Sequence, residues 1–289
     1  MKPTQSPHLV PFDGSFKVAS VSTTPPAGDG KSWGKKKLKK LVEELAELQA
    51  ALYATDSYSL LLVFQALDAA GKDGVVRAVT SGVNPAGFQV FSFKKPSAEE
   101  LDHDFLWRTS RALPERGRIG IFNRSYYEDV LVVRVHPEYL AGSQLPKPID
   151  FKTVWTDRYE SIRNHEKHLV QNGTVVLKFW LNVSRAEQKR RFVSRIDTAE
   201  KNWKFSVRDV EESWLYPEYL KAYEASLAAT STKWAPWYAI PADDKEYARW
   251  AVADVVVRTL RALPLAFPEP SADDRKKMKE LRKKLAKDD

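Results

Sequence analysis

The chain has 289 residues, with 46 lysines and arginines against 38 acidic residues and no cysteine. The absence of cysteine excludes disulfides, thiolate metal sites and cysteine nucleophiles. The net charge of +8 favours a polyanionic partner without saying which one. No apolar run approaches the roughly 20 residues that span a bilayer, and the first residues lack a signal core, so we expect a cytoplasmic protein with no membrane contact.

The two ends of the chain differ in composition from its middle. Residues 1–35 are rich in proline, serine, threonine and glycine, which predicts an extended N-terminal arm. Residues 266–289 form a basic C-terminal tail, in which a solvated amphipathic helix is favoured over a binding arm. The intervening residues 36–265 are long enough for one α/β domain with a substantial core.

Apolar runs and helical patterns alternate through this middle part. Leucines recur at helical spacing over 36–54, and another helix is expected over 150–171, before Asn172 and Gly173. Two capping boxes mark further helix starts, at Ser97 with Glu100 and at Ser184 with Glu187. The expected strands are 59–66, 88–95, 118–123, 174–184 and, more weakly, 236–242. Short apolar strands separated by helices predict an α/β fold with a parallel five-stranded sheet flanked by helices.

The first expected strand runs into ALDAAGKDG, residues 66–74, which partly matches a phosphate-binding loop. The pattern is a glycine, four residues, then glycine-lysine and a serine or threonine, but Ala66 replaces the first glycine and Asp73 the hydroxyl residue. Small residues let backbone N–H groups turn around a phosphate, the following helix N-terminus adds partial positive charge, and Lys72 adds a full one. An ordinary tight turn with a solvated lysine is the alternative interpretation.

An acidic residue inside this loop adds a further indication. The Asp68 carboxylate would be repelled by bound phosphates unless a divalent cation lay between them. Position 73 lacks the hydroxyl group that binds magnesium in the usual pattern. The Asp68 carboxylate is therefore a candidate to bind the ion in its place. A catalytic base at Asp68 is the other possibility.

The third expected strand leads into IGIFNRSYYEDVLVV, residues 119–133. Nucleotide kinases commonly have an acid that reaches magnesium at the end of this strand, whereas this chain has Asn123 followed by Arg124. Arg124 could fork onto phosphate oxygens. The nearest acids are Glu128 and Asp129, and Asp129 could bind magnesium or deprotonate an incoming phosphate. A capping acid and a surface arginine are the alternative.

A basic segment, residues 185–209, follows the fourth expected strand. Arg191 and Arg195 are four residues apart, as are Lys204 and Arg208, so each pair is expected to project from one helical face. Two such faces joined by a short connection would suit a lid that closes over phosphates. A solvated hairpin whose acids neutralise its bases explains the same charges equally well.

Taken together, these segments resemble the second family of polyphosphate kinases. The likeness covers approximately residues 36–265, and the motifs occur in the order that the family has. The segments that carry it are ALDAAGKDG (66–74), SGVNPAGFQV (81–90), FNRSYYEDVLVVRVHP (122–137) and RRFVSRIDTAEKNWKFSVRD (190–209).

The resemblance implies a P-loop kinase fold with a helical lid over about 185–209, and reversible phosphoryl transfer between inorganic polyphosphate and nucleotides. The cofactor that it implies is Mg²⁺, with Mn²⁺ as the alternative. The residues expected to be catalytic are Asp68, Lys72, Arg124 and Asp129, with Asp68 and Asp129 also binding the metal. Contacts to nucleotide or phosphate are expected from Ala70, Gly71, Asp73, Gly74, Asn123 and Glu128. Contacts to polyphosphate are expected from Lys94, Arg191, Arg195, Lys204 and Arg208.

One departure from the family's pattern suggests a class within it. Asn123 stands where many members have aspartate, and the Glu128-Asp129 pair resembles the third class, whose members phosphorylate both AMP and ADP. The resemblance then gives Asp129 the metal or base role and Glu128 a role in positioning the nucleotide. Expected partners are polyphosphate and adenine or other purine nucleotides, in a homo-oligomer that binds no nucleic acid. An ATP-dependent nucleoside monophosphate kinase and a non-enzymatic polyanion binder are the alternatives.

Overall fold

A computed structural model describes residues 2–27, 33–146 and 148–286. Those parts of the expected arm and tail that fall on residues 1, 28–32 and 287–289 lie outside the described residues. The sheet has five parallel strands in the order β2-β3-β1-β4-β5, which confirms the predicted fold class. The strands are β1 (Ser59–Gln65), β2 (Phe88–Ser92), β3 (Ile119–Asn123), β4 (Thr174–Asn182) and β5 (Trp237–Pro241).

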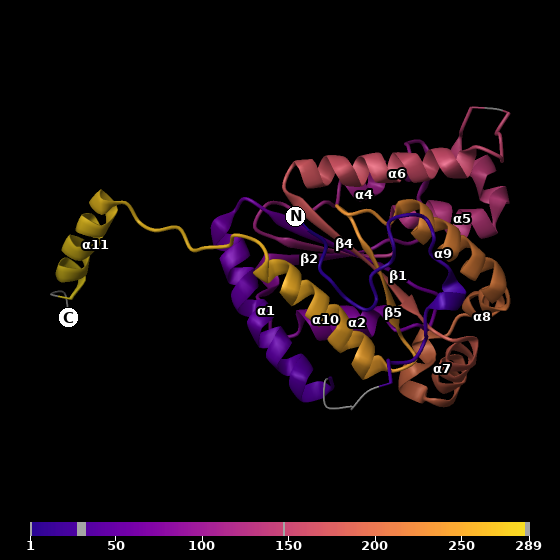
Figure 1. Ribbon diagram of the computed structural model, residues 1–289, viewed down its shortest axis with the longest axis horizontal. Coiled ribbons are helices and arrows are strands. Elements are labelled where there is room, and N and C mark those ends of the chain that lie inside the picture. Colours follow the sequence, from indigo (N-terminus) through magenta and orange to yellow (C-terminus); the bar gives the residue numbers. More distant parts are fainter. Residues whose placement is uncertain (1, 28–32, 147, 287–289) are drawn as a thin grey trace.

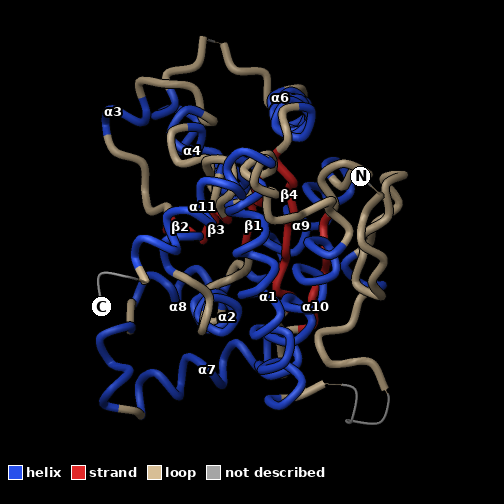
Figure 2. The backbone as a smooth tube through the Cα atoms, turned by 90° about the vertical axis from the view of Figure 1, so that its left-hand side faces the viewer, coloured by secondary structure: helices blue, strands red, loops and turns tan. Residues whose placement is uncertain are grey.

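Helices cover both faces of the sheet (Figures 1 and 2). On one face α10 packs against α1 and α2, and on the other α9 packs against α5 and α6. These helices are α1 (Lys35–Thr55), α2 (Lys72–Thr80), α5 (Val132–Val135), α6 (Val154–Gln171), α9 (Tyr216–Thr230) and α10 (Lys245–Arg261). The shorter or outlying helices are α3 (Ala98–Leu101), α4 (Trp107–Ser110), α7 (Arg185–Asp197), α8 (Val207–Trp214) and α11 (Ala272–Leu285). None of the helices in the described ranges is long and apolar enough to cross a membrane.

Most expected element boundaries differ from the observed ones by one to four residues, and one expected capping box is incomplete. Strand β2 ends at Ser92 rather than at residue 95; it lies at an edge of the sheet, its residues are only partly buried, and Pro96, which has no N–H to donate, follows shortly after. The box at Ser184 is only half formed, because Ser184 accepts from the backbone N–H of Glu187 while the Glu187 carboxylate pairs with two arginines instead. The box at Ser97 is complete, although its helix is only four residues long.

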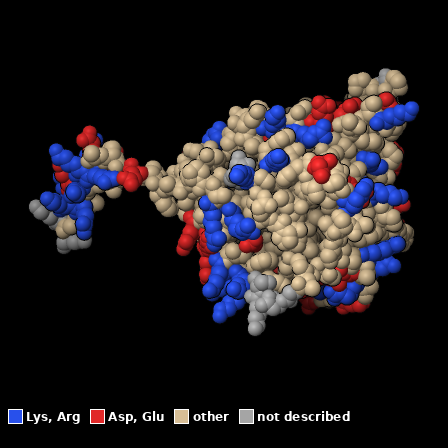
Figure 3. Space-filling model, viewed as in Figure 1, with Lys and Arg blue, Asp and Glu red and all other residues tan. Residues whose placement is uncertain are grey.

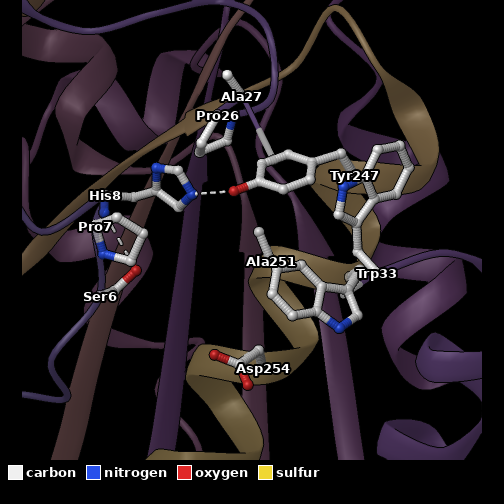
Figure 4. Close-up of a pocket in the computed structure, with 10 residues that line it drawn as sticks. Ser6, Pro7, His8, Pro26, Ala27, Trp33, Tyr247, Ala251 and Asp254 are labelled. Carbon is white, nitrogen blue, oxygen red and sulfur yellow. Dashed lines mark hydrogen bonds between the residues drawn. The ribbon is translucent and has the colours of Figure 1, made fainter. Parts of the chain in front are cut away.

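The N-terminal arm explains why the weakest expected strand is fully buried. The arm runs antiparallel to the outer edge of β5, where Val10 N–H donates to Trp237 O at 2.9 Å and Ala239 N–H donates to His8 O at 2.8 Å. The His8 imidazole meets the Tyr247 hydroxyl of α10 at 2.6 Å, beside a pocket of about 200 Å³ (Figure 4). The arm therefore covers an edge that would otherwise be open to strand pairing.

The C-terminal helix α11 stands apart from the rest of the molecule (Figure 1). Every residue of α11 is exposed, and in Figure 3 basic side chains cover much of its visible surface. The chain between residues 264 and 271 leads to it without helix or strand.

Candidate active site

The loop after β1 occupies the carboxyl edge of the sheet, where parallel α/β sheets bind their ligands. It joins Gln65, the last residue of β1, to Lys72, the first of α2. The loop turns through left-handed backbone conformations at Ala69 (φ 64°) and Gly71 (φ 105°). At Ala69 this conformation costs about 1–2 kcal/mol, because a Cβ atom crowds the following carbonyl. Such strain is typical of loops whose shape is required for binding.

The Lys72 side chain folds back across the loop. Its Nζ atom donates to Ala66 O at 2.6 Å and lies 3.5 Å from Leu67 O. Burial lowers the pKa of Lys72, and the nearby Asp68 carboxylate partly opposes that shift. The ammonium group is thus held inside the loop by carbonyl oxygens.

A buried arginine from α7 supports the loop from behind. Arg191 is only 5% exposed, and its guanidinium donates to Ala69 O at 3.2 Å and Ala70 O at 2.6 Å. It also donates to two carbonyls after β5, those of Ala242 and Asp243, at 2.6 and 3.1 Å. The expectation that Arg191 projects from the lid toward phosphates therefore differs from the structure, in which its donors are used to hold the loop.

Arg124 connects the loop to the segment after β3. Its backbone is left-handed (φ 63°), and its N–H donates to Phe64 O at 3.0 Å, which fixes it beside the end of β1. One guanidinium nitrogen donates to Asp68 Oδ1 at 2.8 Å and another to Glu128 Oε2 at 3.4 Å. The two carboxylates raise the pKa of Arg124 against the opposing effect of burial, with Glu128 contributing most. Loop, arginine and Glu128 thus form one network.

Glu128 and Asp129 lie in a short 3-10 helix, η3 (Tyr126–Val130), but they face different groups. Burial raises the pKa of Glu128, opposed by Arg124 and Lys72. Burial also raises the pKa of Asp129 to about 6, opposed by Arg158 and Arg108. Asp129 Oδ1 lies 3.6 Å from a nitrogen of Arg158, which also donates to Asp129 O at 2.6 Å. Glu128 is therefore the acid that contacts the loop network, and Asp129 is paired toward α6.

The segment expected to form a lid, about residues 185–209, also contacts the loop at Asp73. Lys204, at the end of the 3-10 helix η5 (Ala199–Lys204), lies 3.4 Å from Asp73 Oδ2, while the Asn123 amide donates to Asp73 Oδ1 at 3.0 Å. Burial alone would raise the pKa of Asp73, but the Asn123 hydrogen bond and the charge of Lys204 outweigh it and lower the pKa. Asp73 joins the end of β3 to the lid.

The other lid bases are not arranged as two paired helical faces. Lys204 and Arg208 belong to separate elements, η5 and α8, and Arg208 donates to the Tyr139 hydroxyl at 2.8 Å. Arg195 lies 3.5 Å from Asp209 across the hairpin. Lys94 is exposed just beyond β2. The expectation of a matched pair is wrong for Lys204 and Arg208, because they lie in different elements, whereas Arg191 and Arg195 lie four residues apart on α7 as expected.

Comparison with protein families identifies the family to which a chain with this loop belongs. Residues 29–265 match the model described as Polyphosphate kinase 2 (PPK2). The chain belongs to the polyphosphate kinase 2 family. It is therefore a kinase with a P-loop type of fold, as the sequence motifs indicated.

Similar proteins agree with this membership. The chain is 55% identical to the ADP-polyphosphate phosphotransferase of Rhodopseudomonas palustris over 251 residues, 86% of this chain and 87% of that protein. It is 43% identical to the AMP/ADP-polyphosphate phosphotransferase of Meiothermus ruber, over 86% and 88% of the two chains. The crystal structure of polyphosphate kinase 2 from Arthrobacter aurescens TC1 has 38% identity and a TM-score of 0.83, covering 92% of this chain and 93% of that one.

Kinases of this kind need a divalent metal ion, and the donor set of this polyphosphate kinase 2 fits one in part. Asp68 offers hard carboxylate oxygens at the loop, of which Oδ1 accepts from Arg124. Within the described ranges no three histidine or acidic side chains converge as a metal site. This suits a divalent cation that takes one or two protein carboxylates and completes its shell with phosphate and water oxygens. Asp129 fits less well, because it pairs with Arg158 of α6 rather than with the loop network, and its side chain is less exposed than that of Asp68, at 14% against 27%.

Several residues of the site gave no signal in the sequence. Gln188 on α7 donates to Asp68 O at 3.0 Å, and Arg158 on α6 holds Asp129. Gln65, in the amide orientation that satisfies both of its polar atoms, donates to Glu128 Oε1 at 2.8 Å. Gln188 and Arg158 lie within helices, where a polar residue looks like any other in an amphipathic pattern. Gln65 is the exception, because a glutamine at the end of an otherwise apolar strand is a sign that the sequence does offer.

Proposed function

We propose that this polyphosphate kinase 2 transfers the terminal phosphoryl group of inorganic polyphosphate to AMP and to ADP, reversibly. The observation that carries the proposal is the continuous network of Lys72, Asp68, Arg124 and Glu128 at the carboxyl edge of the sheet. The names of the relatives at 55% and 43% identity, which specify ADP in one case and AMP and ADP in the other, support both acceptors.

Catalysis in this site would consist of positioning and charge neutralisation, because phosphoryl transfer requires little covalent chemistry from the protein. Lys72 and the N–H groups of the loop would bind one phosphate, and Arg124 would exchange a carboxylate partner for phosphate oxygens. Arg195, Lys204 and Arg208 would contact the polyphosphate from the lid. The acceptor phosphate would then attack the terminal phosphoryl group in line. Asp129, with a pKa of about 6, can hold or release a proton near neutral pH.

The metal and the setting belong to the same proposal. We infer Mg²⁺ as the ion, with Mn²⁺ able to replace it, because Asp68 supplies hard oxygen ligands. Bound there, the ion would neutralise negative charge on the phosphates. A cytoplasmic location and a homo-oligomer are proposed as well, the first on the absence of cysteine and the second on the family resemblance and the aromatic content.

Product analysis tests the proposal directly. Purified protein with polyphosphate, Mg²⁺ and AMP, but no ATP, should yield ADP and then ATP, and ADP supplied alone should yield ATP. A parallel reaction with ATP and AMP, without polyphosphate, is the control for an ordinary nucleoside monophosphate kinase. If only the control reaction forms product, the donor is ATP and the proposal fails.

A further inference from the structure

A fully buried ion pair lies beneath the active-site segment. Lys178, in the middle of β4, and Glu166, on α6, both have completely buried side chains, and Lys178 Nζ lies 2.6 Å from Glu166 Oε2. Burial lowers the pKa of Lys178 to about 8, although Glu166 opposes that shift. Desolvating two charges costs several kcal/mol per ion, so apolar residues of similar size would often be as stable here. The pair therefore calls for an explanation other than stability.

The polar atoms of the pair are used in a closed set of hydrogen bonds. Lys178 also donates to the Tyr127 hydroxyl at 3.0 Å and to Thr230 O, at the end of α9, at 2.8 Å. Glu166 Oε1 accepts from the hydroxyls of Tyr126 and Tyr127 at 3.0 and 2.9 Å. Both tyrosines are fully buried. One carboxylate oxygen thus holds two consecutive tyrosines.

These tyrosines immediately precede the two acids of the site. Tyr126 and Tyr127 open η3, and Glu128 and Asp129 follow in the same turn. A 3-10 helix of five residues has too few internal hydrogen bonds to hold its own shape, so its position depends on outside contacts. The Tyr126 hydroxyl donates to Glu166, and the Tyr127 hydroxyl donates to Glu166 and accepts from Lys178.

We propose that Lys178 and Glu166 are positioning residues, which set the location of Glu128 and Asp129 through the hydroxyls of Tyr126 and Tyr127. The inference rests on the proposed function of the site, since it concerns where the acids lie when phosphoryl transfer occurs. A displacement of 1 Å in a catalytic group can cost about a hundredfold in rate. The tyrosine hydroxyls that link the ion pair to the two acids are neutral. What they require at position 166 is therefore an acceptor oxygen and not a negative charge.

Two double variants separate the acceptor oxygen from the charges. Glu166→Gln with Lys178→Met removes both charges but keeps an oxygen for the tyrosines, whereas Glu166→Leu with Lys178→Met removes the oxygen as well. We expect kcat of the first variant within about threefold of the wild type, and kcat of the second lower by roughly ten- to a hundredfold with KM for polyphosphate and nucleotide little changed. Equal kcat values for the two variants would overturn the proposal.

Tyrosine variants test the same connection if the second double variant fails to fold. Tyr126→Phe combined with Tyr127→Phe keeps the rings and removes only the hydroxyls, and it should lower kcat by a similar factor. Tyr238→Phe is the matched control, because Tyr238 is equally buried but its hydroxyl donates to Thr4 O, in the N-terminal arm. Loss of kcat in the control as large as in the paired variant would refute the positioning role.

Amide hydrogen exchange over residues 125–130 separates this inference from the proposed function. Exchange should be faster in the variant with Glu166→Leu and Lys178→Met than in the one with Glu166→Gln and Lys178→Met, whatever the phosphoryl donor is. Unchanged exchange refutes the positioning role even if polyphosphate is the donor. Faster exchange in a protein that fails to use polyphosphate would refute the proposed function and leave the positioning of the acids supported.

Discussion

Neighbouring arginines on α7 show that position in a sequence does not determine what a side chain does. Arg190 and Arg191 both pair with Glu187, but Arg190 is 68% exposed and Arg191 is buried among four carbonyl oxygens. Because Arg191 holds the carbonyls of Ala69 and Ala70, it constrains the turn that carries the loop's N–H groups. A guanidinium has enough donors in a fixed plane to do this, and a lysine does not.

Replacing Arg191 should therefore affect both stability and turnover. Arg191→Ala leaves buried carbonyls without partners, and we expect a loss of about 2–4 kcal/mol in the free energy of unfolding. We expect kcat to fall by roughly a hundredfold as the loop loses its shape. Urea unfolding and steady-state kinetics measure the two effects. Arg190→Ala is the control and should leave stability nearly unchanged, because Arg190 is exposed. An Arg191 variant that changes only KM for polyphosphate would restore the lid role expected from the sequence.

A second prediction at this scale concerns Asp68 and Asp129, the two acids that are expected to bind the metal. Asp68→Asn and Asp129→Asn should each abolish turnover while polyphosphate binding stays the same or becomes tighter, because each removes a negative charge from a site that is proposed to bind a polyanion. Turnover is measured by nucleotide product, and binding by displacement of labelled polyphosphate. Asp157→Asn, an exposed carboxylate at the start of α6, should leave both unchanged. Full activity in both variants would show that neither acid has the expected role.

At the scale of elements, the strands were predictable from the sequence. A strand that is covered on both faces of the sheet needs apolar side chains along its whole length, so a continuous apolar run indicates burial. All seven residues of β1 are buried, and the pattern of its sequence alone indicates this. The buried state of β5 was harder to predict, since it depends on an arm more than 200 residues away in the chain. The segments of the site after β1 and β3 were predictable because Phe64 lies opposite Asn123 in the sheet, so both strands end together.

What the sequence could not predict is which groups each side chain contacts. Spacing suggested that Arg191 faces phosphates, but only the packing of α7 against the loop shows that it turns inward. Likewise, Lys178 lies in an apolar strand with no local feature to show its buried partner, because Glu166 is on another element. Contacts of this kind depend on tertiary structure, which the local periodicity of a sequence does not reveal.

The arm's attachment to α10 leads to a prediction on pH. Burial lowers the pKa of His8 from 6.5 to about 4, so the unfolded chain binds more protons than the folded one between these values. The contribution of neutral His8 to stability is thus fully present above pH 6.5 and is lost as pH falls toward 4, on the order of 3 kcal/mol. We expect the stability advantage of the wild type over His8→Gln to shrink by about that amount from pH 7 to pH 4, measured by urea unfolding. A constant difference would contradict it.

At the scale of the whole molecule, the two ends of the chain differ: α11 is rich in basic residues and exposed, whereas the N-terminal arm packs into the core. Helix α11 has seven lysines and arginines and three acidic residues, yet all its residues are exposed, including Met278, Leu281 and Leu285. The N-terminal arm has the opposite character, since it buries Val10 and Phe16 in the core. With seven basic and three acidic residues, α11 carries +4 of the net charge of +8, so half of the excess positive charge lies on a part of the chain that has no buried residue.

Removing each end of the chain should consequently have unequal effects. Deletion of residues 271–289 should leave turnover at saturating polyphosphate nearly unchanged and the midpoint of thermal unfolding within a few degrees, because no core contact is lost. Deletion of residues 2–7 together with Val10→Ala and Phe16→Ala should destabilise the protein by several kcal/mol, since each core side chain removed costs about 2–5 kcal/mol. Calorimetry and the product assay, applied to both, make the comparison. A collapse of turnover without the tail would mean that α11 reaches the substrate, despite its separation from the sheet edge in the structure.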